Sequence, residues 1–121
     1  MLRDETIERV IRFRDDRNWR QFHTPKDLAL SLSLEAAELL EVFQWSGTDV
    51  ECRDKLDKIQ EELADVLSYC ILMADVCGLD LDEIINAKVT KNEEKYPVDK
   101  AWGSAAKYTQ LKADKRGKEE R

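Results

Sequence analysis

Residues 24–45 read TPKDLALSLSLEAAELLEVFQW, which is the pattern of one long helix. Thr24 can cap this helix, Pro25 suits its first position, and Asp27 gives a pattern like a capping box. Apolar residues then lie on nearly every side of the helix until Gly47 ends it. A helix that is apolar nearly all round is a buried one, and in a chain this short such burial indicates a partner subunit.

Three further helices are predicted from apolar residues that recur every three or four positions. They cover about residues 2–17, 50–77 and 80–95. Gly78 provides a C-terminal glycine for the second of them, and Pro97 stops the third. Four helices with short connections predict a bundle.

The composition agrees with an all-α fold. Of the 121 residues, 42% are hydrophobic and 38% are charged, a mixture typical of amphipathic helices. Only four Gly and two Pro are present, too few for a turn-rich all-β fold. The sequence therefore predicts one all-α, four-helix bundle-like domain over residues 1–111. The remaining residues, 112–121, are almost wholly charged and predict a disordered tail.

Charge and cysteine content argue against several classes of protein. The formal net charge is −6, and no basic face is evident outside the far C-terminus, so a nucleic-acid polymer is not expected as a partner. No stretch approaches the roughly 20 apolar residues of a membrane span, and no signal-peptide region precedes the first helix. The cysteines are Cys52, Cys70 and Cys77, an odd set without a C-x-x-C motif, which predicts a reducing, cytoplasmic setting.

Two pairs of acidic residues stand three positions apart on predicted helices: Glu35 with Glu38, and Glu62 with Asp65. Residues at this spacing share one helix face, so antiparallel packing of the two helices would bring all four carboxylates together. Such crowding in apolar surroundings is unfavourable unless the carboxylates take up protons or bind a cation. Oxygen ligands of this kind select Mg²⁺, Mn²⁺ or Ca²⁺, and Mg²⁺ also binds substrate phosphates.

Other interpretations of the acidic pairs remain open. They could form a solvated face with salt bridges on a helical protein-association module. Against this, Glu35, Glu38 and Glu41 have no basic residue three or four positions away. A di-iron carboxylate bundle would need two Glu-x-x-His motifs, and the only histidine, His23, lies outside any such motif.

With these residues the chain resembles the MazG-like all-α nucleotide pyrophosphohydrolases, and within them the small dCTP pyrophosphatase group. The family signature, E-x-x-E followed by E-x-x-D, reads Glu35-Ala-Ala-Glu38 and Glu62-Leu-Ala-Asp65. Four longer strings also match: W-x-Q-F-H at 19–23, E-L-x-E-x-F-Q-W at 38–45, E-E-L-x-D-V-L at 61–67, and K-x-x-x-N-x-x-x-Y-P at 88–97.

The resemblance implies an activity and its requirements. It implies hydrolysis of nucleoside triphosphates between the α and β phosphates, with dCTP or a related dNTP as the expected preference, as part of nucleotide-pool house-cleaning. It implies Mg²⁺, for which Mn²⁺ can substitute, held by the four acidic residues. It also implies a homodimer or a homotetramer. A carboxylate that accepts the proton of the attacking water is expected, and Glu38 and Glu41 are the candidates.

The resemblance further implies which residues bind the nucleotide. Base contacts are expected from Trp19, His23, Trp45 and Tyr69, whose aromatic rings could instead serve in ordinary packing. Phosphate contacts are expected from Lys88 and Asn92, which share one helix stripe with Lys95; the alternative is a solvated helix face. Lys107 and Tyr108 are expected to close over the site.

One position departs from the family pattern. Some dCTP-preferring relatives have a histidine on the first helix that faces the base, and the residue that aligns with it here is Val10. This departure bears on the cytosine preference and leaves the predicted chemistry unchanged.

Overall fold

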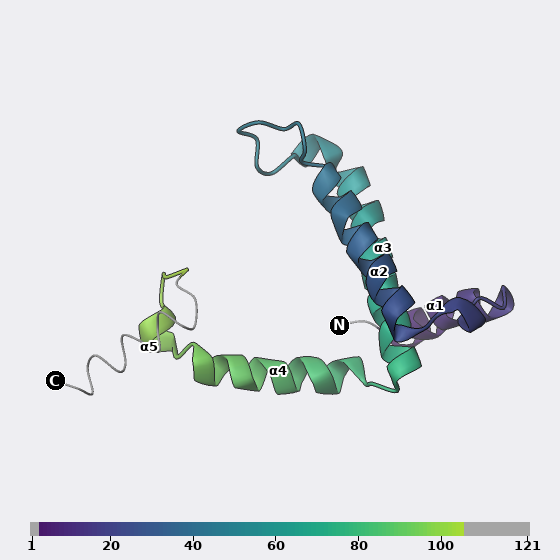
Figure 1. The fold of residues 1–121 in the computed structure, drawn as a ribbon. Helices are drawn as coiled ribbons and strands as arrows, with labels where there is room; N and C mark the ends of the chain where they lie inside the picture. Colours follow the sequence, from purple (N-terminus) through teal and green to yellow (C-terminus); the bar gives the residue numbers. More distant parts are fainter. Residues whose placement is uncertain (1–2, 106–121) are drawn as a thin grey trace. The chain divides into compact units, whose positions relative to one another are not determined.

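Helices are the only regular elements in the part of the chain that the computed structural model describes, residues 3–105 (Figure 1). The chain divides into two compact units, Met1–Asp80 and Leu81–Arg121. The first unit holds α1 (Asp4–Asp16), α2 (Pro25–Glu41) and α3 (Leu56–Cys77), with 3₁₀ turns at Arg20–Phe22 and Arg53–Lys55. The second holds α4 (Leu81–Lys95) and α5 (Val98–Ala101). The predicted all-α class is confirmed.

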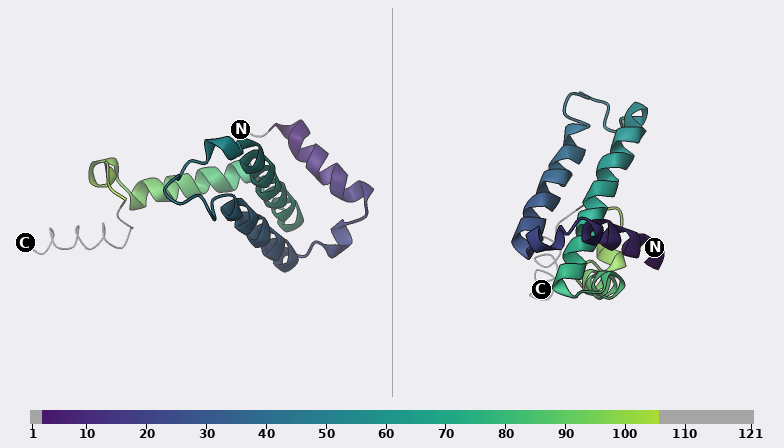
Figure 2. Two further views of the ribbon diagram at one scale, coloured as in Figure 1. Left: turned by 90° about the horizontal axis from the view of Figure 1, so that it is seen from above. Right: turned by 90° about the vertical axis from the view of Figure 1, so that its right-hand side faces the viewer.

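The centre of the first unit is an antiparallel pair formed by α2 and α3, which lie side by side along their length (Figures 1 and 2). The start of α2 is as predicted: the Asp27 backbone N–H donates to Thr24 Oγ1 at 3.1 Å, and the Thr24 hydroxyl donates to Asp27 Oδ2 at 3.0 Å. Pro25 occupies the first turn. The first of these bonds satisfies one backbone N–H that a helix start leaves unpaired, and the second holds the two side chains together.

Two predicted helix limits need correction, both at the connection between α2 and α3. The predicted helix to residue 45 ends at Glu41, because Val42, Phe43 and Gln44 donate to carbonyls three residues back and form turns. The predicted helix from residue 50 begins only at Leu56.

The late start of α3 has a local cause. The backbone N–H groups of Glu51 and Cys52 both donate to Asp49 Oδ1, at 3.2 and 3.1 Å. Cys52 adopts a left-handed conformation with φ of 48°, which an α-helix cannot include. Asp49 thus offers the backbone an alternative to the helical hydrogen-bond ladder, as aspartate does in turns.

The other end of α3 confirms the predicted glycine stop. Gly78 has a φ of 67°, its N–H donates to the Asp75 carbonyl at 3.2 Å, and the Leu79 N–H donates to the Ala74 carbonyl at 2.8 Å. This is the bonding of a Schellman motif, in which glycine accepts the left-handed conformation without a steric penalty.

At this end of the pair, α1 packs against α3 (Figure 2). The contact face of α1 is the predicted one: Ile7, Val10 and Ile11 are half-buried, and Arg14 is buried. Few apolar side chains of the unit are fully buried: Leu28, Ile71, Leu72 and Ala74, together with Cys52.

The apolar surface of α2 is only partly covered within one chain. Leu28 is 1% exposed, whereas Leu30, Leu34 and Leu40 are 56%, 66% and 70% exposed. Within the single chain this helix is not buried on several sides, and the prediction that a partner subunit completes its burial stays a prediction. One neighbouring helix, α3, covers one side of α2 and leaves the opposite leucines in contact with water.

Three further features of the described residues bear on the predictions. Lys88 is exposed, and Asn92 and Lys95 are half-buried at positions of α4 that share one stripe. The three cysteines, Cys52, Cys70 and Cys77, are free thiols. Among the described residues no helix combines the length and apolar character that crossing a membrane requires.

Candidate active site

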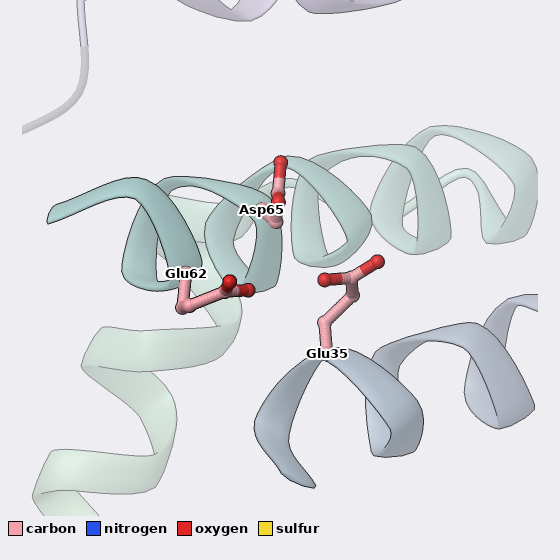
Figure 3. A group of neighbouring side chains, drawn as sticks. All are labelled: Glu35, Glu62 and Asp65. Carbon is pink, nitrogen blue, oxygen red and sulfur yellow. The ribbon is translucent and has the colours of Figure 1, made fainter. Parts of the chain in front are cut away.

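Three of the four predicted acidic residues form a cluster between α2 and α3. One carboxylate oxygen from each of Glu35, Glu62 and Asp65 lies within 4.8 Å of the others. The Glu35 and Glu62 side chains point toward one another from the two facing helices (Figure 3). The antiparallel packing of α2 and α3 therefore brings these acidic residues together, as the three-residue spacing predicted, because the acidic turn of each helix lies opposite that of the other.

The fourth acidic residue, Glu38, joins the same cluster. Burial first, then hydrogen bonding with Glu38 and the charges of Glu38, Asp65 and Glu62, together raise the pKa of Glu35 to about 7. The same causes, burial first and Glu38 second, raise the pKa of Glu62. Each carboxyl is thus disfavoured as an anion by desolvation and by its acidic neighbours.

The cluster has the properties of a cation site. Glu35 Oε2 and Glu62 Oε2 are buried, and neither has a hydrogen-bond partner among the described residues. Buried carboxylate oxygens without a donor are unfavourable, and a divalent cation supplies the missing positive charge. Carboxylate oxygens are the ligands that Mg²⁺, Mn²⁺ and Ca²⁺ prefer. The residues present therefore fit a hard divalent metal ion.

A pocket of about 490 Å³ lies between α1 and α3, next to the acidic cluster. Asp65 belongs to both, so the pocket opens beside the proposed ligands. Three predicted base contacts, Trp19, His23 and Tyr69, are among its walls. The other lining residues are Thr6, Arg9, Val10, Phe13, Arg14, Ser68 and Leu72. The volume lies within the range of small-molecule sites.

His23 is held close to neutral in this pocket. Burial, followed by the nearby positive charges of Arg14 and Arg20, lowers its pKa below the usual value. Its Nδ1 atom is buried and has no hydrogen-bond partner among the described residues. A neutral imidazole offers one donor and one acceptor, so His23 suits hydrogen bonding to a polar ligand edge better than proton transfer.

The aromatic wall of the pocket is fixed by contacts within α1 and the turn after it. The Phe13 and Trp19 rings meet edge to face with centroids 5.7 Å apart, and the Arg17 guanidinium lies 3.7 Å from the Phe13 centroid. Trp19 is still 45% exposed, so its ring combines a fixed orientation with a free surface. Such a surface can stack on a planar base.

Several predicted residues do not join this arrangement in the first unit. Glu41 is exposed at the end of α2 and is not among the residues whose charges act on Glu35 or Glu62. Trp45 follows α2 in a turn and is 86% exposed. Lys88, Asn92 and Lys95 belong to the second unit, and Lys107 and Tyr108 lie outside the described residues.

Some pocket residues were not predicted from sequence. Thr6 and Arg9 come from α1, and their contribution depends on where α1 packs. Ser68 could have been predicted as a pocket residue, because it follows Asp65 by three positions and so shares its helix face. The pocket also includes Val10.

A helical chain whose acidic residues gather on two antiparallel helices, beside a mostly apolar pocket, has the architecture of the all-α nucleoside triphosphate pyrophosphohydrolases. Residues 30–111 match the MazG-like family, and the chain belongs to this family. It is 38% identical to dCTP pyrophosphatase 1 of Mus musculus over 117 residues, covering 89% of this chain and 69% of that protein. The human protein of the same name is 39% identical over 119 residues, with the same coverage.

A solved structure supports the same assignment. The crystal structure of a pyrophosphatase from Archaeoglobus fulgidus is 42% identical in sequence and superimposes with a TM-score of 0.73. The match covers 78% of this chain and 91% of that one. The family resemblance seen in the acidic motifs is thereby confirmed.

Proposed function

We propose that this chain hydrolyses nucleoside triphosphates to a nucleoside monophosphate and pyrophosphate in a reaction that depends on Mg²⁺. The observation that carries the proposal is the meeting of Glu35, Glu62 and Asp65 within 4.8 Å beside a pocket of nucleoside size. The names of the relatives, dCTP pyrophosphatase 1 and pyrophosphatase, support this activity. Nucleotide-pool house-cleaning in a reducing cytoplasm is the setting that we infer from it.

The acidic residues would hold the metal. Glu35, Glu38, Glu62 and Asp65 are the proposed ligands, and Mn²⁺ has the same oxygen preference as Mg²⁺. Bound there, the ion would neutralise charge on the triphosphate and lower the pKa of water. Water would add to one phosphorus of the α–β anhydride, the bond from that phosphorus to the bridging oxygen would break, and monophosphate and pyrophosphate would leave.

We favour Glu38 over Glu41 as the carboxylate that accepts the proton of the attacking water. Glu38 is an exposed residue of α2 that also hydrogen-bonds with Glu35 and Glu62, so it reaches both the cluster and solvent. A general base must lie within hydrogen-bond reach of the water that it deprotonates. Glu41, which is exposed at the end of α2, lacks this contact with the cluster.

The base would occupy the pocket between α1 and α3. The Trp19 ring offers a stacking surface, His23 offers hydrogen-bonding nitrogens, and Tyr69 lies one helical turn after the ligand Asp65. Trp45 is proposed as a further contact. A preference for dCTP or a related deoxynucleotide follows from the relatives' names, although Val10 cannot form the hydrogen bond that a histidine would. Lys88, Asn92 and Lys95 are the proposed phosphate contacts.

Product analysis tests this function. The purified chain is incubated with Mg²⁺ and a panel of canonical and modified nucleoside triphosphates, and monophosphate, pyrophosphate and orthophosphate are measured separately. We expect monophosphate and pyrophosphate in equal amounts, with activity abolished by a chelator and restored by Mg²⁺ or Mn²⁺. Orthophosphate as the sole product would show that a different bond is cut.

We further propose that the chain works as a homodimer or homotetramer. The support is the row of leucines on α2 that α3 leaves exposed: Leu30, Leu34 and Leu40. Exposed apolar patches of this kind mark association surfaces in soluble proteins. A second copy of α2 would cover them with leucines of its own, as a two-fold interface requires.

Replacing Leu30 with aspartate should therefore dissociate the assembly. We expect light scattering coupled to size exclusion to give a mass of two or four times 14.1 kDa for the wild type. The Leu30→Asp variant should fall to one chain at micromolar concentration, because a buried unpaired charge opposes the interface. Thr48→Asp, which adds the same charge to an exposed residue outside α2, serves as the control. An unchanged mass for Leu30→Asp would exclude this face.

A further inference from the structure

Arg14 is the one charged side chain that is fully buried among residues 3–105, at 2% exposure. Its Nη1 donates to Asp75 Oδ2 at 2.7 Å, and its Nε donates to Asp15 Oδ1 at 2.9 Å. Asp15 is a neighbour on α1, whereas Asp75 lies in the last turn of α3. The guanidinium thus connects the two helices that form the pocket, through a short charge-assisted hydrogen bond.

The same contacts include the segment that carries Trp19 and His23. The Trp19 backbone N–H donates to the Arg14 carbonyl at 3.1 Å, and Arg20 Nη1 lies 3.4 Å from Asp75 Oδ2. Two arginines, one from α1 and one from the turn after it, therefore converge on one carboxylate of α3. Asp75 follows the pocket residue Leu72 by three positions, so this carboxylate is fixed relative to the α3 side of the pocket.

We propose that the Arg14–Asp75 ion pair positions α1 and residues 17–23 against α3, and so sets the shape of the pocket that binds the base. The inference rests on the proposed function, because it assigns the pocket to the nucleotide. Arg14 is a positioning residue: its guanidinium is directed at carboxylates, and it acts on the substrate through Trp19 and His23.

Apolar packing alone leaves this placement weakly specified. No apolar side chain of α1 is fully buried, and Ile7, Val10 and Ile11 are only half-buried. Half-buried aliphatic side chains tolerate small shifts of a helix, whereas a buried guanidinium that loses its carboxylate is left as an unpaired charge. The ion pair therefore penalises any sliding of α1 along α3, and such a shift would displace Trp19 with it.

The test compares kinetic constants for Arg14→Lys and Asp75→Asn with those of the wild type. Lysine keeps the charge but lacks the planar fork of donors, and asparagine keeps the shape but lacks the charge. We expect KM for the nucleotide to rise about tenfold while kcat stays within about twofold, because the metal ligands are untouched. The controls are Arg12→Lys and Asp16→Asn, exposed residues of α1 that should leave both constants unchanged.

Two further measurements separate positioning from a general structural role. In the double variant Arg14→Lys, Asp75→Asn, KM should be no higher than in the worse single variant, because each change removes the same Arg14–Asp75 ion pair. Asp75→Glu should recover part of the affinity, since it restores the carboxylate. If Arg14→Lys does not fold, Asp75→Asn alone tests the inference. The Asp75 side chain is 31% exposed, and asparagine is nearly isosteric with aspartate, so this variant is expected to fold. An unchanged KM, or a fall in kcat alone, would overturn the inference.

Amide hydrogen exchange distinguishes failure of the inference about the Arg14–Asp75 ion pair from failure of the proposed function. A wild type that releases no pyrophosphate would contradict the proposed function. Exchange in α1 and residues 17–23 should still be faster in Asp75→Asn than in the wild type, with α2 unchanged. Equal exchange in the two proteins would show that the ion pair does not hold this segment in place.

Discussion

Replacing Glu38 with glutamine is expected to lower the rate of pyrophosphate release by about a thousandfold, the combined effect of losing a general base and a metal ligand. Glutamine keeps the size of glutamate but can neither accept the proton of water nor balance the charge of a cation. Glu38 stands in hydrogen-bonding contact with both Glu35 and Glu62, so it cannot change without affecting the whole cluster. Steady-state release of pyrophosphate at saturating Mg²⁺ measures the effect.

The same assay distinguishes the two candidate bases. If Glu38 is the base, Glu41→Gln should retain activity within about threefold of the wild type, because an exposed charge outside the cluster contributes little. A thousandfold loss in Glu41→Gln with an active Glu38→Gln would reverse the assignment. Glu51→Gln is the control for charge removal: Glu51 is exposed outside the cluster, pairs with Arg53 at 2.9 Å, and should be dispensable.

The thermal stability of the metal-free protein is expected to fall as pH rises through 7, and Mg²⁺ should remove this fall. Glu35 has a pKa of about 7 in the folded chain against an ordinary value of 4.5, and the pKa of Glu62 is raised as well. A raised pKa means that folding favours the protonated carboxyl. Its contribution to stability is therefore complete below 4.5 and is lost as pH rises through about 7.

A bound cation reverses this dependence because it favours the ionised carboxylates. We expect the affinity for Mg²⁺ to weaken as pH falls below 7. Each proton that Mg²⁺ must displace should weaken the affinity about tenfold per pH unit. Melting temperatures at about pH 5 and about pH 8, with and without Mg²⁺, give the measurement. Glu35→Gln should lose much of the dependence, whereas Glu51→Gln should keep it. A melting temperature that is independent of pH in the wild type would contradict the buried, mutually repelling cluster.

Local sequence signals predicted most helix ends correctly, because the groups that cap a helix are close in the chain. Thr24, Asp27 and Gly78 form the expected caps. The errors fall in residues 42–55, where Asp49 binds its own backbone and Cys52 takes a left-handed conformation. The sequence pattern predicted helix up to residue 45 and again from residue 50, but the two backbone hydrogen bonds that Asp49 accepts outweigh this pattern before α3.

The sequence by itself determined the helical class and the four acidic residues, since both rest on the spacing of residues along a helix, and its motifs carried the MazG-like resemblance. Only the tertiary structure decided which carboxylates meet. It places Glu35, Glu38, Glu62 and Asp65 together and leaves Glu41 exposed outside the cluster, although all five lie on α2 or α3. Tertiary packing also made Arg14 a buried ion-pair partner of Asp75, 61 residues away. Contacts across such distances depend on how the helices cross, which residue spacing within one helix does not specify.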